Sequence, residues 1–432
     1  MAKKRIKTIK LGLVGANGQG ESFVAHAEQV GMKCVAICDL RKEQLKELKK
    51  RYQVETYTDY DKFLEHDLDA VVVATPFHTH APLAIKALRA GKHVMSETSA
   101  CLTMAQGVEL IREVEKSRKI YMFAENCAYY PVPQEMRRLY KAGEIGDFKY
   151  GEGAYLHPMS AEYFNSISFG VNHWRNWLPV TYYNTHSLAP IMYITDTWPV
   201  KVNGFVIPHD PYDRQKTMTA RRCDTASAII LRMNNEAVVR LLQYDLRGKE
   251  GEKILGNRGM MERFCFGSGQ MIRVHKKAFD KKPSEPDEKV YTVDFPPIEK
   301  IDVGNYSKSS AAATSLRLKF KSGAVTSLIM DYLFAEAIRR NEQPYMNVYR
   351  AVAMSAVGIL AYRSALADSV SLEIPDFRKE AIRQQYEQDH WSPDPAVHTD
   401  DQPWPSILGD IKPSKRALAY AQKMWKKTEG TH

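Results

Sequence analysis

Residues 6–39 read IKTIKLGLVGANGQGESFVAHAEQVGMKCVAICD, and this stretch decides the fold of the chain. The mixture of Ile, Leu and Val with lysines from Ile6 to Val14 predicts a strand, and the glycine-rich turn after it leads into a helix that runs toward Gly31. Residues 34–38 are a short apolar run typical of a buried strand, and the acid Asp39 follows them. Strand, glycine-rich turn, helix, strand and acid in this order predict the opening of a dinucleotide-binding unit.

The glycine-rich turn departs at one position from the usual G-x-G-x-x-G spacing. Gly15 and Gly20 take the first and third glycine positions, whereas Asn17 takes the second and has Gly18 beside it. After glycine, asparagine is the residue that best tolerates a left-handed backbone. The glycines alone would also fit an ordinary tight turn, so the prediction of a pyrophosphate site at the helix N-terminus rests on their context.

The acid after the second strand predicts the identity of the cofactor. Asp39 can accept hydrogen bonds from the adenosine ribose hydroxyls, and its charge repels a 2′-phosphate. Arg41 is an opposing feature, because a basic side chain two residues later can reach such a phosphate. On balance we expect NAD as the cofactor.

Length and composition predict a globular chain of more than one domain. With 432 residues, 44% of them hydrophobic, the chain can fill two or three cores. It has no apolar run of the roughly eighteen residues that a membrane span needs, and its N-terminus lacks the apolar segment of a signal peptide. The six cysteines include no C-x-x-C pair, which predicts reduced, mostly buried thiols. We therefore expect a cytoplasmic protein without a membrane partner.

The net charge of +10 raises the question of nucleic-acid binding. The excess is dispersed, and its densest parts are the first ten residues and the tail from Lys412 to Lys427. No RNA-binding aromatic signature or helix-turn-helix pattern lies between them. The charge therefore indicates a solvated surface, and we expect no nucleic-acid partner.

Helix and strand patterns alternate from residue 41 to about residue 142. The run Ala70-Val71-Val72-Val73-Ala74 is continuous and β-branched, as buried parallel strands are. Six parallel strands with intervening helices predict a doubly wound sheet in an NAD-binding Rossmann domain over residues 1–128. Ligands of such sheets bind beyond the carboxyl ends of the strands. The residues expected at those ends are Asp39, Thr75, Glu97 and Asn126.

The pattern changes after Gly146 to strand runs separated by turns, which predicts an α+β domain with an open, mostly antiparallel sheet over residues 129–432. Residues 173–186, between its first two strands, are rich in aromatic residues, His and Arg. Lys276 to Ile301 is rich in Lys, Asp and Pro and predicts an exposed loop. Amphipathic helices are expected over residues 326–339 and 346–367.

Several motifs together make the chain resemble the Gfo/Idh/MocA family of NAD(P)-dependent sugar oxidoreductases over nearly its whole length. They are residues 12–18, GLVGANG; Ala74-Thr75-Pro76 with His80; and Gly91-Lys92-His93-Val94 leading to Glu97. The family usually continues from that Glu with Lys-Pro, and the Lys assists proton transfer to or from the sugar hydroxyl. Here Thr98-Ser99 stand in that place. Dehydrogenase members tend to carry Asp four residues before a catalytic His, whereas this chain has Tyr182 before His186.

Both departures resemble the branch of NAD-dependent α-N-acetylgalactosaminidases and related glycosidases. This chain matches the motifs of that branch in order, with residues 125–129, 151–157, 183–190, 331–332 and 375–377. The resemblance implies a Tyr-x-Thr-His segment in which the Tyr takes part in acid–base work. That Tyr corresponds to Tyr183. The match weakens beyond Trp198, so the resemblance does not extend to substrate identity.

The resemblance and the strand-end positions together give the expected site. The catalytic candidates are Tyr183 and His186, which are three residues apart and would share one face of a helical turn. The residues expected to bind NAD are Gly15, Asn17, Gly18, Gln19, Gly20, Asp39, Arg41, Thr75, Pro76, His80, Glu97 and Asn126. The residues expected to bind the substrate are Glu152, His157, Arg175 and Trp177. No metal is expected, because His78 and His80 have no acid placed to complete a zinc site.

We expect an enzyme that hydrolyses a glycoside through transient oxidation of the sugar at C3, elimination, water addition and re-reduction. The alternatives are a net NAD-dependent sugar or inositol dehydrogenase and, in another class, a non-catalytic regulator that binds sugar and nucleotide. Tyr183 can act as a base near neutral pH only if a cation lowers its pKa, and His186 and the cofactor are the candidates. The exposed antiparallel sheet also predicts a homo-oligomer.

Overall fold

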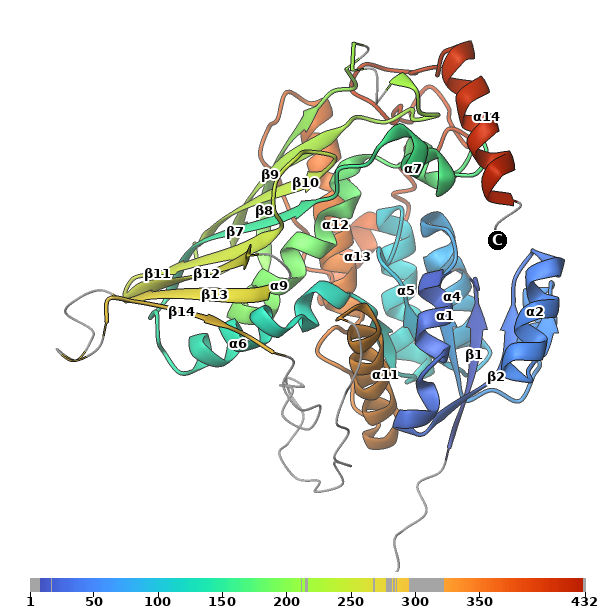
Figure 1. Cartoon of the computed structure of the whole chain (residues 1–432), viewed down its shortest axis with the longest axis horizontal. Coiled ribbons are helices and arrows are strands. Elements are labelled where there is room, and N and C mark those ends of the chain that lie inside the picture. Colours follow the sequence, from blue (N-terminus) through green and yellow to red (C-terminus); the bar gives the residue numbers. More distant parts are fainter. Residues whose placement is uncertain are drawn as a thin grey trace, which may run out of the picture. The chain divides into compact units, whose positions relative to one another are not determined.

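The computed structural model describes residues 8–429 except 17, 211, 214–216, 267–268, 277–281, 283, 285 and 295–321. Contacts divide the chain into two compact units. Figure 1 labels their helices and strands. The first unit comprises Met1–Tyr129 and Pro296–Val352, and the second comprises Tyr130–Phe295 and Ala353–His432. Among the described residues, no helix combines the length and the apolar character that a membrane crossing requires.

The first unit contains a six-stranded parallel sheet with the order β3-β2-β1-β4-β5-β6. This order confirms the predicted doubly wound Rossmann sheet. The central strand β4 is buried along its whole length, as its continuous apolar run predicts. The strands are β1 (Ile9–Val14), β2 (Met32–Cys38), β3 (Glu55–Tyr57), β4 (Ala70–Val73), β5 (His93–Ser96) and β6 (Tyr121–Phe123). The helices before residue 130 are α1 (Gly18–Val24), η1 (Ala27–Val30), α2 (Lys42–Tyr52), α3 (Tyr60–Leu64), η2 (Phe77–Thr79), α4 (His80–Arg89), α5 (Met104–Ser117) and η3 (Asn126–Tyr129).

A helix far along the chain belongs to this first unit. Helix α11 (Ser322–Arg340) packs beside α1, η1 and η3. The Ser22 and Ser327 hydroxyls are 2.9 Å apart, and the Arg339 guanidinium donates to the carbonyl oxygen of Val30 at 2.6 Å. Residues 296–352 therefore group with the Rossmann unit, whereas the expected second domain ran without a break from residue 129. Contacts between residues so distant in sequence leave no local pattern from which to predict them.

The second unit contains a nine-stranded sheet with the order β14-β13-β12-β11-β7-β10-β9-β8-β15. Strands β7 and β10 pair in parallel and all other neighbours pair antiparallel, which confirms the predicted open, mostly antiparallel sheet. The strands are β7 (Phe148–Leu156), β8 (Pro199–Ile207), β9 (Ala226–Met233), β10 (Val238–Tyr244), β11 (Gly251–Gly256), β12 (Gly259–Phe266), β13 (Gly269–Lys276), β14 (Glu288–Thr292) and β15 (Leu372–Glu373).

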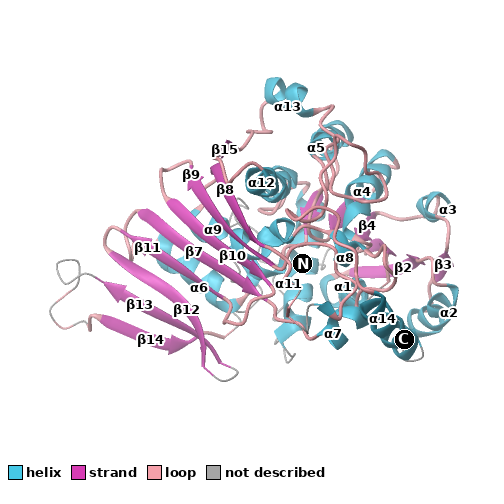
Figure 2. Ribbon diagram, turned by 90° about the horizontal axis from the view of Figure 1, so that it is seen from above, coloured by secondary structure: helices cyan, strands magenta, loops and turns pink. Residues whose placement is uncertain are grey.

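Helices α6 (Pro131–Lys141) and α9 (Thr185–Thr195) cover one face of this sheet, as Figure 2 shows. Before α9 the chain forms three short helical turns, and the last two of them carry most of the segment rich in aromatic residues, His and Arg. These are α7 (Ala161–Ser166), α8 (Trp174–Trp177) and η4 (Val180–Asn184). The later helices are α12 (Val348–Leu366), α13 (Glu380–Tyr386) and α14 (Lys415–Glu429).

The predicted loop from Lys276 to Ile301 is wrong in one part. Strand β14 pairs with β13, with Val274 opposite Lys289, so residues 288–292 form an edge strand. Most of this strand is exposed, and its charged side chains are typical of an edge that avoids further pairing. Composition favoured a loop because the strand has no buried apolar face. Residues 277–281 and 295–301 of the predicted loop lie outside the described residues.

Candidate active site

The glycine-rich turn after β1 makes two close backbone approaches. Gly15 has φ +85°, and a Cβ atom there would lie 2.5 Å from the carbonyl oxygen of Ala74. A Cβ atom on Gly20 would lie 2.2 Å from the carbonyl oxygen of Gly15. Both positions therefore require glycine. Gly18 has open space beside it at the start of α1, with Gln19 exposed next to it, and Asn17 lies outside the described residues.

Asp39 follows β2 and closes this turn. Its Oδ2 accepts a hydrogen bond from the backbone N–H of Ala16 at 2.8 Å. Arg41 binds both carboxylate oxygens, through Nε at 3.0 Å and Nη2 at 3.1 Å. Burial would raise the pKa of the Asp39 carboxyl, but the hydrogen bonds from Arg41 and Ala16 hold that pKa below its usual value. Asp39 is therefore a charged hydrogen-bond acceptor. Arg41, the basic residue that counted against NAD in the sequence, is paired with it.

Thr75, Pro76 and His80 lie beyond β4. The His80 ring is buried, and its nitrogens lie 3.0 Å from the carbonyl oxygen of Ser99 and 2.7 Å from that of Thr75. Burial lowers the pKa of His80. Both ring nitrogens are thus used within the protein, so His80 joins two loops, whereas Thr75 and Pro76 remain accessible. The structure does not leave His80 a ring nitrogen to offer to a cofactor.

Glu97 and Asn126 lie beyond β5 and β6. The Glu97 carboxylate accepts a hydrogen bond from the backbone N–H of Thr98 at 3.1 Å, and the Thr98–Ser99 peptide bond is cis. Asn126 opens η3, and its side-chain oxygen lies 3.5 Å from the sulfur of Cys127. With Asp39 and Thr75, these residues occupy the carboxyl edge of the parallel sheet. The glycine approaches, the helix N-terminus and the charged Asp39 fit the donor and acceptor pattern of NAD.

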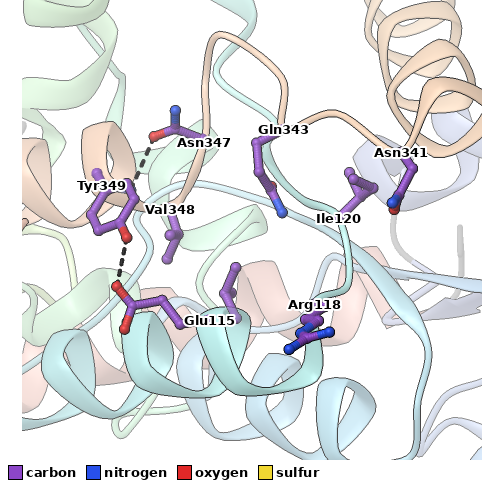
Figure 3. A pocket seen from close by; sticks show the side chains of 9 residues that line it. Glu115, Arg118, Ile120, Asn341, Gln343, Asn347, Val348 and Tyr349 are labelled. Atoms are coloured by element: carbon purple, nitrogen blue, oxygen red, sulfur yellow. Dashed lines mark hydrogen bonds between the residues drawn. The ribbon is translucent and has the colours of Figure 1, made fainter.

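A surface pocket of about 310 Å³ lies elsewhere in the first unit (Figure 3). It is lined by Arg118, which follows the last turn of α5, and by Ile120, which precedes β6. Within it the Tyr349 hydroxyl donates to a carboxylate oxygen of Glu115 at 2.6 Å. The amino end of β6 is at the edge opposite to Gly15 and Asp39, so this pocket is separate from the predicted cofactor residues.

The second unit holds an aromatic cluster around Tyr183. Its ring is stacked with Tyr155 at 6.3 Å and with Trp174 at 6.2 Å between ring centroids. The ring of Tyr244 lies closer, at 4.7 Å, and that of His186 lies at 6.1 Å. Tyr183 is in η4 and His186 is in α9, so successive short helices bring the two predicted catalytic residues together.

Arg175 is the cation next to Tyr183. Its Nη1 donates to the Tyr183 hydroxyl oxygen at 2.7 Å, and its guanidinium lies 4.3 Å from the centroid of the Trp174 ring. No carboxylate of the described part of the chain forms an ion pair with it. Burial raises the pKa of Tyr183, and the Arg175 guanidinium opposes that rise. Sequence reasoning named His186 and the cofactor as the cations for Tyr183. In the structure the group at its hydroxyl is Arg175, and the pKa is raised.

Tyr244 is a member of the cluster that sequence reasoning missed. It ends β10, is buried, and has φ +72°, which is unusual for a residue other than glycine. Next to it Asp245 forms a buried ion pair with Arg221 at 3.0 Å. Asp245 also accepts a hydrogen bond from the backbone N–H of Met159 at 3.1 Å. The feature that points to Tyr244 is the pairing of β10 with β7. The two strands are parallel, so the end of β10 lies beside the end of β7.

His157 lies near the cluster, whereas Glu152 does not. The rings of His157 and Tyr155 are 6.0 Å apart, and burial, with a contribution from Arg175, lowers the pKa of His157. Tyr155 packs on His186 of α9, at 4.5 Å. Glu152 is three residues from Tyr155 and so points to the other face of the sheet, where Arg240 donates to it at 2.9 Å. The structure therefore does not bring Glu152 together with the other predicted substrate residues.

Trp177 is also placed differently from its prediction. It is only 2% exposed, and its indole N–H donates to the carbonyl oxygen of Asn172 at 3.3 Å. The tryptophan beside Tyr183 and Arg175 is Trp174. Both residues lie on the single turn of α8, and the direction of that turn decides which side chain faces the cluster. Composition alone does not give that direction.

Comparisons with known proteins agree with the fold. Residues 9–125 match the model of an oxidoreductase family with an NAD-binding Rossmann fold. The chain is 24% identical over 407 residues to an alpha-N-acetylgalactosaminidase of Bacteroides fragilis, covering 88% of this chain and 94% of that protein. It is 23% identical over 413 residues to a glycosyl hydrolase family 109 protein of Phocaeicola vulgatus, covering 87% and 95%. In fold it is similar to a levoglucosan dehydrogenase in complex with NADH and levoglucosan, with a TM-score of 0.70 and 18% identity over 86% of this chain and 100% of that one.

Proposed function

We propose that the protein is an NAD-dependent glycoside hydrolase of the Gfo/Idh/MocA type, on the basis of the match of residues 9–125 to an oxidoreductase family with an NAD-binding Rossmann fold. The observation that carries the proposal is the Arg175–Tyr183 pair, in which a guanidinium donates at 2.7 Å to a tyrosine hydroxyl inside an aromatic cluster. The sequence similarity to an alpha-N-acetylgalactosaminidase over most of the chain supports it. Aromatic faces beside polar groups are also a common surface for binding sugars.

The proposed reaction breaks the glycosidic bond only after the sugar has been oxidised. Bound NAD would supply the oxidant that takes hydride from C3 and later the reductant that returns it. Gly15, Gly20 and Asp39 would hold that cofactor, the glycines by allowing close backbone approach and Asp39 by accepting hydrogen bonds from the ribose. Tyr183 takes the proton of the C3 hydroxyl.

Oxidation at C3 makes the neighbouring C–H bond acidic, which allows the rest of the reaction. Loss of the C2 proton expels the group at C1, and water then adds at that carbon. His186, close to Tyr183 and in contact with Tyr155, is the proposed base for the C2 proton. Arg175 keeps the Tyr183 hydroxyl oriented, and His157 and Trp174 border the sugar.

A net NAD-dependent sugar dehydrogenase is the second candidate. The fold similarity to a levoglucosan dehydrogenase favours it. Thr98 counts against it, because Thr98 stands where dehydrogenases of the family usually carry the lysine that assists proton transfer. A non-catalytic regulator is disfavoured by the pairing of Tyr183 with an arginine that has no carboxylate partner among the described residues, since packing alone does not require it.

A panel of nitrophenyl glycosides, tested on the protein as purified and without added cofactor, distinguishes the three candidates. The proposed hydrolase releases nitrophenol over many turnovers with no net NADH and takes up deuterium at C2 from heavy water. The dehydrogenase accumulates NADH with a free sugar and added NAD. The regulator binds sugar without either product. Tyr183→Phe keeps the ring and is expected to lower turnover by roughly 10²–10⁴.

We further propose that the chain forms homo-oligomers through the open face of the nine-stranded sheet. Phe205 of β8 is 51% exposed and Val290 of β14 is 43% exposed. Apolar side chains on an open sheet support self-association. Light scattering after size exclusion tests this, and Phe205→Lys should shift the mass toward the monomer if β8 takes part.

The proposed location is the cytoplasm. Cys34, Cys38, Cys101, Cys127 and Cys223 are buried and form no disulfide among the described residues, which suits a reducing compartment. Cell fractionation with an antibody against the chain measures this directly, and recovery from an extracytoplasmic fraction would contradict it.

A further inference from the structure

Tyr244 is placed to act on Tyr183. It comes from the end of β10, on a strand paired with β7, and its ring centroid is 4.7 Å from that of Tyr183. The two hydroxyls are hydrogen-bonded to each other, and Tyr244 also has a hydrogen bond with Arg175. The left-handed backbone of Tyr244 is held on one side by the hydrogen bond from the N–H of His157 to its carbonyl oxygen, at 3.0 Å. A buried tyrosine kept in an unfavourable backbone conformation indicates a specific role for its side chain.

The charges around Tyr244 favour sharing of a proton. Two guanidinium groups face it, those of Arg175 and Arg221, and Arg221 lies 5.7 Å from the ring centroid. The charge of Arg221 is balanced by Asp245, at 3.0 Å. The charge of Arg175 is balanced by no carboxylate of the described residues, and its side-chain hydrogen bonds go to the two tyrosines. The other titratable groups near the pair are Tyr155 of β7, His157 beyond β7, His186 of α9 and Cys223 in the loop before β9.

Arg175 is half-buried, and a cation removed in part from water without an acid is costly unless a neighbouring group can carry negative charge. Here the neighbours are the hydroxyls of Tyr183 and Tyr244, which share the guanidinium of Arg175. In a coupled pair of this kind, the proton is lost from the pair and not from one residue. Burial raises the pKa of Tyr244, while Arg175 and Arg221 oppose that rise, so Tyr244 has one more opposing arginine than Tyr183 has.

We propose that Tyr244 is a positioning residue whose hydroxyl exchanges a proton with that of Tyr183, so that the two tyrosines act as one acid–base unit over Arg175. The inference rests on the proposed function. With the pair deprotonated once, the sugar O–H proton moves to the Tyr183 oxygen and the Tyr183 proton moves to the Tyr244 oxygen. Bound NAD would accept the hydride from the same sugar carbon, and both tyrosines end neutral. Return of the hydride reverses both proton movements.

The first test measures ionisation without requiring activity. Protein labelled with [ζ-13C]tyrosine is titrated, with Tyr183→Phe and Tyr244→Phe used to assign the two signals. In the parent protein both signals should shift together over one pH range. In Tyr244→Phe the Tyr183 transition should move to higher pH, by a unit or more. A Tyr183 transition that is unchanged in Tyr244→Phe, or a pair that shows no transition before the protein unfolds, would overturn the proposal.

The second test is the pH dependence of turnover on a glycoside that the parent enzyme cleaves. Tyr244→Phe should lower kcat by roughly 10–100-fold near neutral pH, with little change in KM and a deficit that shrinks as the pH rises. Tyr150→Phe is the matched control, because Tyr150 lies on β7 but donates to Glu152 on the opposite face, at 3.0 Å, and should leave the profile unchanged. A deficit that is equal at all pH values would indicate a merely structural tyrosine and overturn the relay.

The two readouts separate this inference from the proposed function. If the parent protein cleaves no glycoside, the proposed function fails, and the labelled-tyrosine titration still decides whether the pair shares a proton. If the parent protein is active and Tyr183→Phe is inactive while Tyr244→Phe is fully active, the proposed function stands and the relay is refuted.

Discussion

Asp39 and Arg41 lie two residues apart, and the structure pairs their side chains through two hydrogen bonds of 3.0 and 3.1 Å. Arg41 partly neutralises Asp39, and the pairing therefore lowers the net negative charge that Asp39 presents to a cofactor. Arg41 is more than half exposed, so it can also turn toward solvent. Selectivity between NAD and NADP therefore depends on both residues.

Substitutions of these two residues should shift selectivity in opposite directions. Asp39→Ala removes the charged acceptor, so NAD affinity should fall by roughly 10–100-fold, the usual effect of losing a hydrogen bond to a charged group, and the preference for NAD should shrink. Arg41→Ala leaves Asp39 unneutralised, so the preference for NAD should grow. Titration calorimetry with both nucleotides measures the two ratios, and a smaller preference in Arg41→Ala would contradict the pairing argument.

Arg175 offers a second residue-scale prediction, on pH dependence. Burial raises the pKa of Tyr183, and Arg175 opposes that rise, so Arg175→Gln should raise the pKa further. A base must lose its proton to act, so the acid limb of the kcat profile should move to higher pH, and activity at pH 7 should fall by roughly 10²-fold or more. Arg240→Gln is a matched control, because Arg240 pairs with Glu152 on the other face. A change confined to KM would show that Arg175 only binds substrate.

At the scale of elements, α11 contains a buried acid that packing does not satisfy. Asp331 is 0% exposed, and neither of its carboxylate oxygens has a hydrogen-bond partner among the residues that the structure describes. Burial raises the pKa of Asp331 well above its usual value. The proton on the Asp331 carboxyl stabilises the folded protein. This contribution is fully present below the unfolded pKa of about 4 and is lost as the pH rises toward the folded pKa. The free energy of unfolding should therefore fall with rising pH in that window.

Asp331→Asn removes this dependence, because the amide does not titrate. Relative to the parent protein, the variant should gain about 1.4 kcal/mol for each pH unit above 4 until the folded pKa is reached. Guanidinium unfolding at pH 5 and pH 8 measures the difference. Glu342→Gln, an exposed carboxylate just after the same helix, is the control and should show no pH-dependent gain. An Asp331→Asn variant that loses stability relative to the parent protein as the pH rises would show that Asp331 is charged in the folded protein.

At the scale of the whole molecule, the Rossmann unit is built from two distant parts of the chain. The backbone N–H of Tyr121 donates to the Gln343 side chain at 3.1 Å, and that of Phe123 donates to the carbonyl oxygen of Met346 at 2.8 Å. Strand β6 thus forms its edge bonds with the segment after α11. Leu328 and Phe334 of α11 are fully buried. The first 129 residues alone lack this cover.

A fragment of residues 1–129 should therefore bind hydrophobic dyes and unfold without a sharp transition. The same fragment joined through a glycine–serine linker to residues 322–352 should unfold cooperatively and bind NAD more tightly. Phe334→Glu in the joined fragment is the control, and it should behave like the short fragment. Cooperative unfolding and equal NAD affinity of residues 1–129 alone would contradict this view of the unit.

The sequence by itself determined the features that depend on short-range patterns. The order of strands and helices to residue 142, the glycines at 15 and 20 and the acid at 39 follow from periodicity and turn chemistry, and the structure has them where they were predicted. Tyr183 and His186 came from a motif of neighbouring residues, and consecutive helical turns bring them close.

Only the tertiary structure decided which distant residues meet. It joined residues 322–352 to the Rossmann unit, and it put Arg175 at the Tyr183 hydroxyl and Tyr244 beside the Tyr183 ring. Strand register, the direction of a single helical turn and packing between remote segments set these relations. Each depends on contacts between separate parts of the chain, and the local sequence of one part does not specify its partner. For that reason composition and spacing did not predict these relations.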